Sequence, residues 1–204
     1  MRLLISLLIC FIVSGCTTTR KLSLTDMSKE VVELPFKIDK LTITDSRIYL
    51  QPMNWRLPMI ATKQQNWKGN PHLSEQNKSD IEYILRNSEK KDGIPVDMEF
   101  KILEGVCEIQ GDWKSVKEYA KFKGELIIEI PDSNYKYNSY AEMFYENPTM
   151  NGTEKGTMKL YNQAVKNVTY ILIKQIQDEI KNNKKYSAPL NICLLYTSPS
   201  PRDA

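Results

Sequence analysis

Few side chains in this 204-residue chain have the types and spacing that catalysis requires. His72 is the single histidine, so a Ser-His-Asp triad would have to be built on it, and a cluster of histidine metal ligands is impossible. The chain has no glycine-rich phosphate loop, no Cys-x-x-Cys motif and no His-Glu-x-x-His motif. We therefore expect no enzyme activity, no cofactor and no metal site.

Two pairs of carboxylates have a spacing that general acid and base chemistry could use. They are Asp97 with Glu99, and Glu142 with Glu146. Asp97 and Glu99 alternate with apolar residues, and Glu142 and Glu146 also fall in a strand-like run. We interpret all four as residues on the wet face of a sheet.

Asp45 and Arg47 are two residues apart on a predicted strand, so they share one face of it. They could form an ion pair or mark the start of a site, and we favour the structural role. Cys107 lies in an apolar, strand-like run with Val106 and Ile109, which indicates a small buried hydrophobic residue more than a nucleophile.

The segment from Gln51 to Leu73 is the candidate binding region. Its three prolines interrupt any helical or strand pattern, and about twenty residues without regular structure are often binding loops. Aromatic and arginine side chains dominate interface hot spots. The candidate partner-binding residues are therefore Trp55, Arg56, Trp67 and His72. The alternative is that Trp55 and Trp67 tuck against the sheet edge as a lid over the core.

The amino terminus has the pattern of an export signal. Arg2 supplies a positive charge, Leu3 to Val13 are almost entirely apolar, and small residues precede Cys16. This apolar run is shorter than the roughly twenty residues that span a bilayer, which favours a removable signal over residues 1–15.

Val13-Ser14-Gly15-Cys16 resembles the lipobox of bacterial lipoproteins. The resemblance implies a diacylglyceryl thioether on Cys16, cleavage before it, and acylation of the new amino terminus. Two acyl chains already anchor a protein stably to a membrane. The alternative is an ordinary secretory signal, which would prefer Ala-x-Ala at its end.

Residues 16–33 are mostly polar and predict a lipidated cysteine followed by a flexible tether. Thr17 follows Cys16, and the first acidic residue is Asp26. In the lipoprotein families that this segment resembles, the lack of early acidic residues implies the outer membrane, facing the periplasm. The net charge of +3, from 28 basic and 25 acidic residues, is too balanced for a nucleic-acid partner.

The carboxyl-terminal residues 192–204 stand apart from the rest. Cys193 to Asp203 looks like the translation of a transposase-type sequencing adapter, so we interpret this segment as a non-native tail and give it no function. The alternative is a natural tail rich in serine and proline.

Residues 34–191 predict a single domain with the order strand, helix, three strands, helix. The first strand is expected near Leu41 to Leu50 and the first helix from about Asp80 to Lys90, with Ser79 and Glu82 as its capping box. Strand patterns cover Ile94 to Ile102, Ala120 to Ile130 and Tyr135 to Tyr145, and a long helix starts near Glu154 or Thr157 and ends at Lys181.

We predict an α+β two-layer sandwich, in which two helices cover one face of a four-stranded, mostly antiparallel sheet. Together with the lipobox and the tether, this order resembles small auxiliary envelope lipoproteins, including the YajG-like group and the lipopolysaccharide-assembly lipoprotein. The resemblance extends to the first strand, Leu41-Thr42-Ile43-Thr44-Asp45-Ser46-Arg47.

Two functions follow as hypotheses. The first is a non-catalytic envelope lipoprotein, membrane-bound through lipid on Cys16, that binds or helps to assemble an envelope protein. The alternative is a lipoprotein that binds a small or lipidic ligand between sheet and helices, which would need an apolar cavity.

Overall fold

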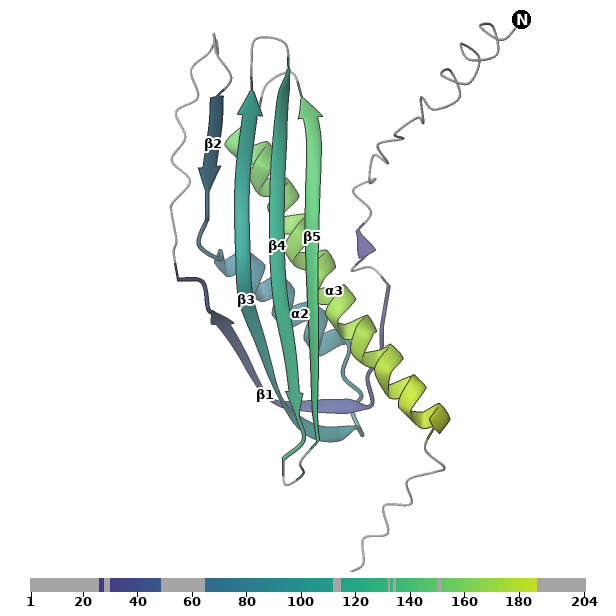
Figure 1. Ribbon diagram of the computed structural model, residues 1–204. Coiled ribbons are helices and arrows are strands. Elements are labelled where there is room, and N and C mark those ends of the chain that lie inside the picture. The colour runs from purple at the N-terminus through teal and green to yellow at the C-terminus, as the bar shows by residue number, and fades with distance from the viewer. Residues whose placement is uncertain are drawn as a thin grey trace, which may run out of the picture.

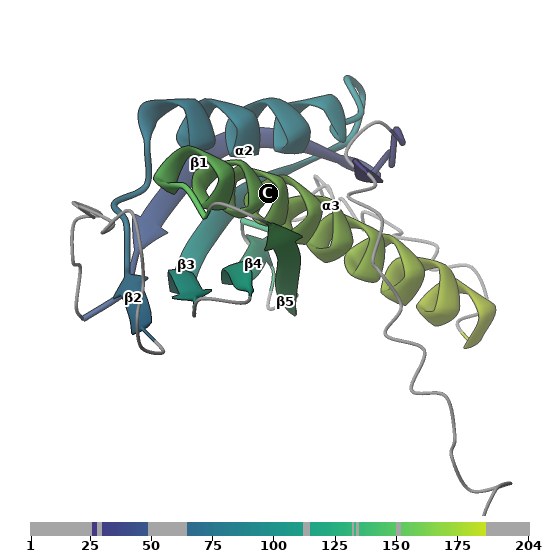
Figure 2. The ribbon, with the colours of Figure 1, turned by 90° about the horizontal axis from the view of Figure 1, so that it is seen from above.

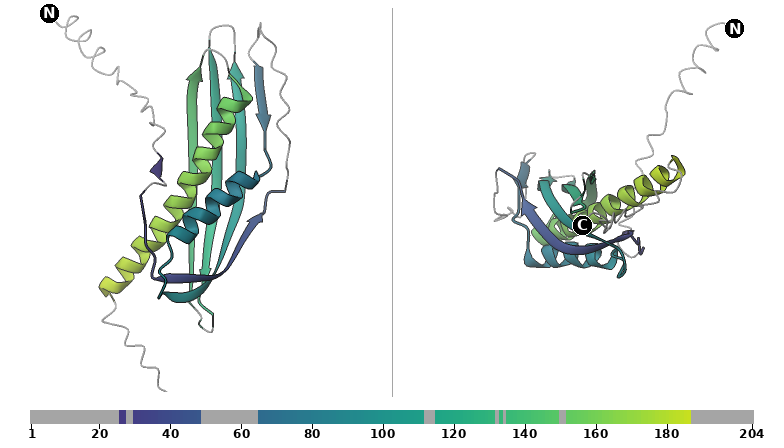
Figure 3. Two further views of the ribbon diagram at one scale, coloured as in Figure 1. Left: turned by 180° about the vertical axis from the view of Figure 1, so that it is seen from behind. Right: turned by 90° about the horizontal axis from the view of Figure 1, so that it is seen from below.

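In the computed structural model, one mixed sheet carries two helices on the same face (Figures 1 and 3). The structure describes residues 26–27, 30–48, 65–111, 115–131, 133, 135–149 and 152–186. Its elements are β1 (Phe36–Asp45), β2 (Gln65–Gly69), α2 (Glu75–Asn87), β3 (Ile94–Gly111), β4 (Val116–Glu129), β5 (Lys136–Thr149) and α3 (Glu154–Tyr186). The α+β two-layer class expected from the sequence is confirmed.

The order of strands across the sheet is β1, β3, β4, β5, with β2 also paired to β3. β1 and β2 therefore share one edge of β3. β1 runs parallel to β3 from Ile94 to Ile102, and β2 runs antiparallel to it from Cys107 to Gly111. The sequence predicted four strands; β2 adds a fifth, within a segment for which we expected no regular structure.

β3 is longer than its sequence pattern suggested because a bulge changes the phase of the alternation. Val96, Met98, Phe100 and Ile102 are buried, and after the register shift between Ile102 and Glu104 the buried positions become odd-numbered. A bulge inserts one extra residue, so the same face of the strand is kept while the sequence alternation breaks. The run therefore continues to Gly111 as a single strand.

The first strand and the first helix both begin about five residues earlier than predicted. β1 starts at Phe36, where Phe36 and Ile38 are buried. α2 starts at Glu75 because Ser74 is its N-cap, and its side chain accepts a hydrogen bond from the Asn77 amide at 3.1 Å. The predicted capping box of Ser79 and Glu82 is wrong: both residues lie inside the helix, where the Ser74 cap already satisfies one free amide.

The core lies between the sheet and the helix layer. The apolar stripe predicted for the last helix packs there, with Tyr161, Val165, Val168, Leu172 and Ile176 at most 1% exposed. α3 packs mainly on β4 and β5, and α2 packs beside α3 (Figure 2). None of the helices among the described residues is long and apolar enough to span a membrane.

The stretch before β1 is packed onto the helices. Leu34 is fully buried and its amide donates to the Ser88 carbonyl at 2.7 Å. Gln177 donates to the Glu33 carbonyl at 2.9 Å, and the Met27 amide donates to the Asn167 side chain at 3.1 Å. The sequence indicated a tether through residue 33, whereas contacts with the domain begin at residues 26–27.

Candidate functional site

Two of the sequence-predicted site residues lie near the part of β3 where pairing with β1 ends, at Ile102, and pairing with β2 begins, at Cys107. Trp55 and Arg56 are outside the described residues, as is Cys16. Trp67 and His72 are described. The described chain stops after Ile48, which is fully exposed, and resumes at Gln65, the first residue of β2.

Arg47 lies at this change of strand partner and joins the two segments that meet there. Its side chain is only 4% exposed, and its Nε and Nη2 atoms donate to the two oxygens of Asp45 at 2.7 and 2.5 Å. Nη1 donates to the carbonyl of Pro71 at 2.9 Å, so the guanidinium joins the end of β1 to the chain that leads from β2 to α2. The expected ion pair is present, and its fork geometry is the strong form of an arginine–carboxylate contact.

The electrostatics of the pair keep both groups charged. Burial raises the pKa of Asp45, but the hydrogen bonds and charge of Arg47 outweigh it, so the pKa lies below its ordinary value. Burial lowers the pKa of Arg47, but the contacts with Asp45 and the neighbouring Tyr161 leave it raised. An ionised, internally satisfied pair fits a structural role.

Gly105 provides the space for this arrangement. A Cβ atom at this position would lie 2.5 Å from the Tyr161 hydroxyl and 2.6 Å from Arg47 Nη1. Tyr161 is fully buried beside the guanidinium, without a hydrogen bond of regular geometry from its hydroxyl, and burial raises its pKa. The three residues therefore form a tightly packed unit at the sheet break.

Cys107 lies next to this unit and is inert. Its side chain is fully buried, it is not in a disulfide, and burial raises its pKa to about 12. Only the thiolate is a good nucleophile or metal ligand, so a buried neutral thiol does neither. The described residues contain no group of three His, Cys, Asp or Glu side chains placed to hold a metal ion.

Trp67 and His72 occupy different environments. Trp67 is half-buried in β2 and faces Ile109 of β3, which belongs to the core side of the sheet. His72 is exposed and lies close enough to Asp45 for its charge to lower the pKa of that carboxyl, after burial and the stronger effects of Arg47. The structure thus brings His72 to the Asp45–Arg47 pair and places Trp67 against the sheet.

Three of the four carboxylates considered for acid and base chemistry form ion pairs with lysines on the outer face of the sheet. Glu99 lies 3.3 Å from Lys101, and Glu142 lies 3.2 Å from Lys121. Glu146 and Lys117 are 2.8 Å apart, and Asp97 is exposed. The interpretation of these residues as the wet face of a sheet is confirmed.

Sequence reasoning missed Glu118, a buried acidic residue of β4 that lies against the beginning of α3. Its oxygens accept from the Thr153 amide at 2.8 Å and from the Asn147 side chain at 3.0 Å. Gly156 makes room for it, because a Cβ there would lie 2.3 Å from Glu118 Oε1. The signal was present in the period-two pattern, since Glu118 precedes Ala120 and Phe122 on the same face.

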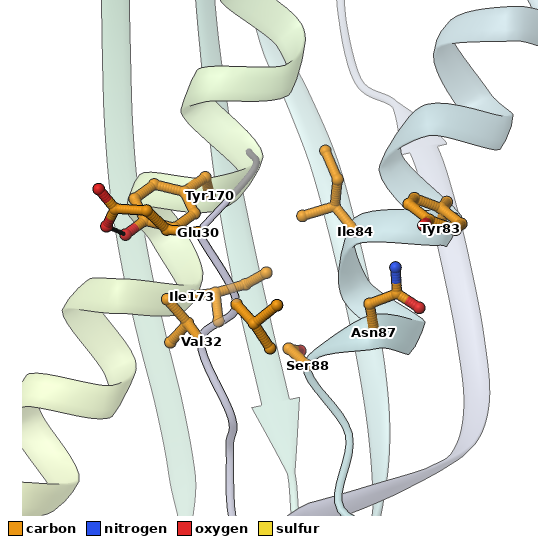
Figure 4. Close-up of a pocket in the computed structure, with 9 residues that line it drawn as sticks. Glu30, Val32, Tyr83, Ile84, Asn87, Ser88, Tyr170 and Ile173 are labelled. Carbon is orange, nitrogen blue, oxygen red and sulfur yellow. Dashed lines mark hydrogen bonds between the residues drawn. The ribbon is translucent and has the colours of Figure 1, made fainter. Parts of the chain in front are cut away.

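A small crevice lies in the helix layer, on the seam between α2 and α3 (Figure 4). Glu30 and Val32 cross this seam, and the Tyr170 hydroxyl donates to Glu30 at 2.5 Å. Burial, followed by this contact, raises the pKa of Tyr170 to about 12. The crevice holds about 40 Å³, which suits a few water molecules and is far below the size of a ligand pocket.

Comparisons with known proteins leave the family open. No protein-family model matches the chain, and no curated protein matches it. A crystal structure of a minor lipoprotein from Acinetobacter baumannii is similar at a TM-score of 0.30 and 14% identity, over 71% of this chain and 91% of that one.

Proposed function

We propose that the protein is a lipid-anchored lipoprotein of the cell envelope whose domain is a non-catalytic binding or assembly component. The observation that carries the proposal is the sequence Val13-Ser14-Gly15-Cys16 at the end of an apolar run. The lack of acidic residues between Cys16 and Asp26 supports the outer membrane, facing the periplasm, as its location.

The structure adds how closely such an anchor would hold the domain. Within the described residues, the Met27 amide already binds Asn167 of α3. If the tether predicted from the sequence covers only the roughly ten residues after Cys16, it would span about 16 to 19 Å. The helix layer would therefore lie near the bilayer surface, and a partner would be an envelope protein within that reach.

The alternative, a ligand held between sheet and helices, has less support. The core positions of β3, β4 and α3 are filled by buried side chains, and the crevice of about 40 Å³ lies on the outer seam of the helices. A drug-sized or lipidic ligand needs several hundred Å³. Two larger hollows, of about 280 Å³ beside Asp97 and Glu99 and about 540 Å³ at the start of α3, are open to solvent and do not lie between sheet and helices.

Labelling with a clickable palmitate analogue tests the anchor. The full chain expressed in a bacterial host should carry the label and sediment with membranes, whereas the Cys16→Ala variant should lose the label and keep its signal segment. Cys107→Ala is the matched control and should stay labelled, because its thiol is buried in the core. Equal labelling of the Cys16→Ala variant would refute the lipoprotein assignment.

The binding surface is tested by crosslinking from the candidate segment. A photoreactive residue at Trp55 or Arg56 should crosslink to one envelope protein, and Trp67→Ala should weaken that crosslink while the domain keeps a cooperative melt. If Trp55→Ala and Trp67→Ala both abolish the cooperative melt, these side chains belong to the core and the surface assignment is wrong.

A further inference from the structure

The two edges of the sheet are protected to very different degrees. At the start of β1, the Ile38 amide donates to Glu89 at 3.1 Å, and the Lys90 amide donates to the Phe36 carbonyl at 2.8 Å. Arg86 also donates to the Ile38 carbonyl at 3.2 Å. The chain between α2 and β3 therefore caps the β1 edge, and β2 beside it is only five residues long.

β5 forms the opposite edge and is long and regular. It spans 14 residues and pairs only with β4 among the described strands. Its register with β4 is continuous from Lys136 to Thr149, without the bulges that interrupt the β1–β3 and β3–β4 pairs. Long edges without bulges are templates for strand addition, because every second residue directs its N–H and C=O groups away from the sheet.

α3 restricts what can occupy this edge. It crosses β5 on the core face, and its C-terminal half extends beyond that strand in both views (Figures 1 and 2). Ser139 hydrogen bonds to Gln175, and the Glu179 carboxylate, after burial, raises the pKa of Tyr137. A second copy of the domain would bring its own helices into the space under this overhang, whereas a single extended strand would fit beside β5.

Exposed aromatic rings lie on the outer face of β5, opposite the face that α3 covers. Tyr140 is 53% exposed and Phe144 is 48% exposed, and both lie on the outer face of β5. Phe144 also contacts Tyr119 of β4, with the ring centroids 5.6 Å apart. A strand added to β5 would place alternate side chains against these rings.

The charges at the edge are complementary to a basic strand. Glu179 is exposed on the overhanging part of α3 and lies close enough to Tyr137 of β5 to act on its pKa, and no ion pair among the described side chains neutralises it. Glu142 is exposed on β5, where it lies 3.2 Å from Lys121 and opposite Lys123 of β4, so its charge is already matched. Lys136, at the lower end of the edge, is already paired with Glu129 at 2.7 Å.

We propose that β5 binds an extended segment of a partner protein by strand addition, and that this segment alternates apolar residues with Lys or Arg. Apolar side chains would pack on Tyr140 and Phe144, and basic ones would face Glu179 under α3. Backbone hydrogen bonds supply the affinity and the two rows of side chains supply the selectivity. β5 lies at the opposite edge of the sheet from β2 and its Trp67, so the inference goes beyond the proposed function and does not depend on it.

The test uses the full chain, purified in non-ionic detergent, and a fluorescent peptide of alternating valine and lysine, (Val-Lys)5. Anisotropy should show saturable binding, and hydrogen exchange should slow at alternate amides of β5 when the peptide binds. The same peptide with alternate backbone amides methylated, and the acidic peptide (Val-Glu)5, should bind at least about tenfold more weakly, because they lack the ladder donors or the charge.

Two charge-matched variants decide whether the site is specific. Asp178→Asn with Glu179→Gln should weaken peptide binding at least about fivefold, since Glu179 lies beside Tyr137 of β5. Glu75→Gln with Glu82→Gln removes the same charge from the exposed surface of α2 and should change binding less than twofold.

Three results would overturn the proposal. The first is equal binding of the methylated peptide, and the second is equal weakening by both pairs of substitutions. The third is slow exchange of the outward β5 amides in the free chain, which would mean that another copy or another segment of this chain already covers the edge.

Discussion

At the residue scale, the feature that organises the described part of the candidate site is the packing of Arg47 against Gly105 and Tyr161. The sequence predicted the Asp45–Arg47 pair from spacing alone. It did not show that the guanidinium is 4% exposed or that a third partner, the Pro71 carbonyl, holds it. Burial of a charge requires neighbours from three other segments, and spacing along one strand carries no information about them.

Gly105→Ala tests the close packing. A Cβ there would lie within 2.6 Å of both Arg47 and Tyr161, so the substitution should reduce the free energy of unfolding by about 2 kcal/mol or more. Gly111→Ala in the same strand is the control, because its Cβ would come no closer than 3.3 Å to its nearest neighbour, the Val116 side chain. Urea denaturation measures both, and equal losses would contradict the argument.

Asp45→Asn should produce a pH-dependent loss of stability. The native pKa of Asp45 is lowered below 3.8, so its stabilising contribution is present above about pH 4 and is lost as the pH falls through the native pKa. The variant should be less stable than the unchanged chain at pH 7, because Arg47 loses its buried partner. The difference should shrink below pH 4; urea midpoints at pH 7 and pH 3 that differ equally would exclude this linkage.

At the element scale, sequence patterns located both helices and all four long strands but misplaced several ends. The ends depend on contacts that a pattern does not contain, such as the Ser74 cap of α2 and the bulge after Ile102 in β3. β2 was missed because its five residues show no apolar alternation and become a strand only through pairing with β3.

Glu118→Gln tests the start of α3. The carboxylate accepts from the Thr153 amide at the positive end of the helix, so loss of its charge should cost about 1 kcal/mol of unfolding free energy. Glu108→Gln on the outer face of β3 is the control and should change stability by less than about 0.5 kcal/mol. If thermal melts show the same small effect for both, Glu118 does not cap the helix.

At the scale of the whole molecule, residues 30–34 complete the helix layer. Leu34 is fully buried, and the Glu30–Tyr170 and Glu33–Gln177 contacts close the seam between α2 and α3. The tether of a membrane-anchored protein would then begin only beyond this seam.

Two truncations measure this contribution. A chain that begins at residue 26 should melt at the same temperature as the full chain, because no described contact is removed. A chain that begins at residue 35 should lose about 3 kcal/mol or more, since burial of Leu34 alone contributes about 2 kcal/mol. Equal melting temperatures would show that residues 30–34 add nothing to the stability of the domain, and that the tether extends through residue 33 as the sequence indicated.

The sequence by itself determined the anchor motif, the fold class, the apolar face of each long element and the absence of catalytic motifs. These properties follow from local periodicity and short motifs, which need no distant partner. Only the tertiary structure decided that Arg47 is buried, that Glu118 binds the Thr153 amide at the start of α3, that β5 is an edge of the described sheet and that α3 extends beyond it. Each of these depends on residues far apart in the chain being brought together by burial of the common core.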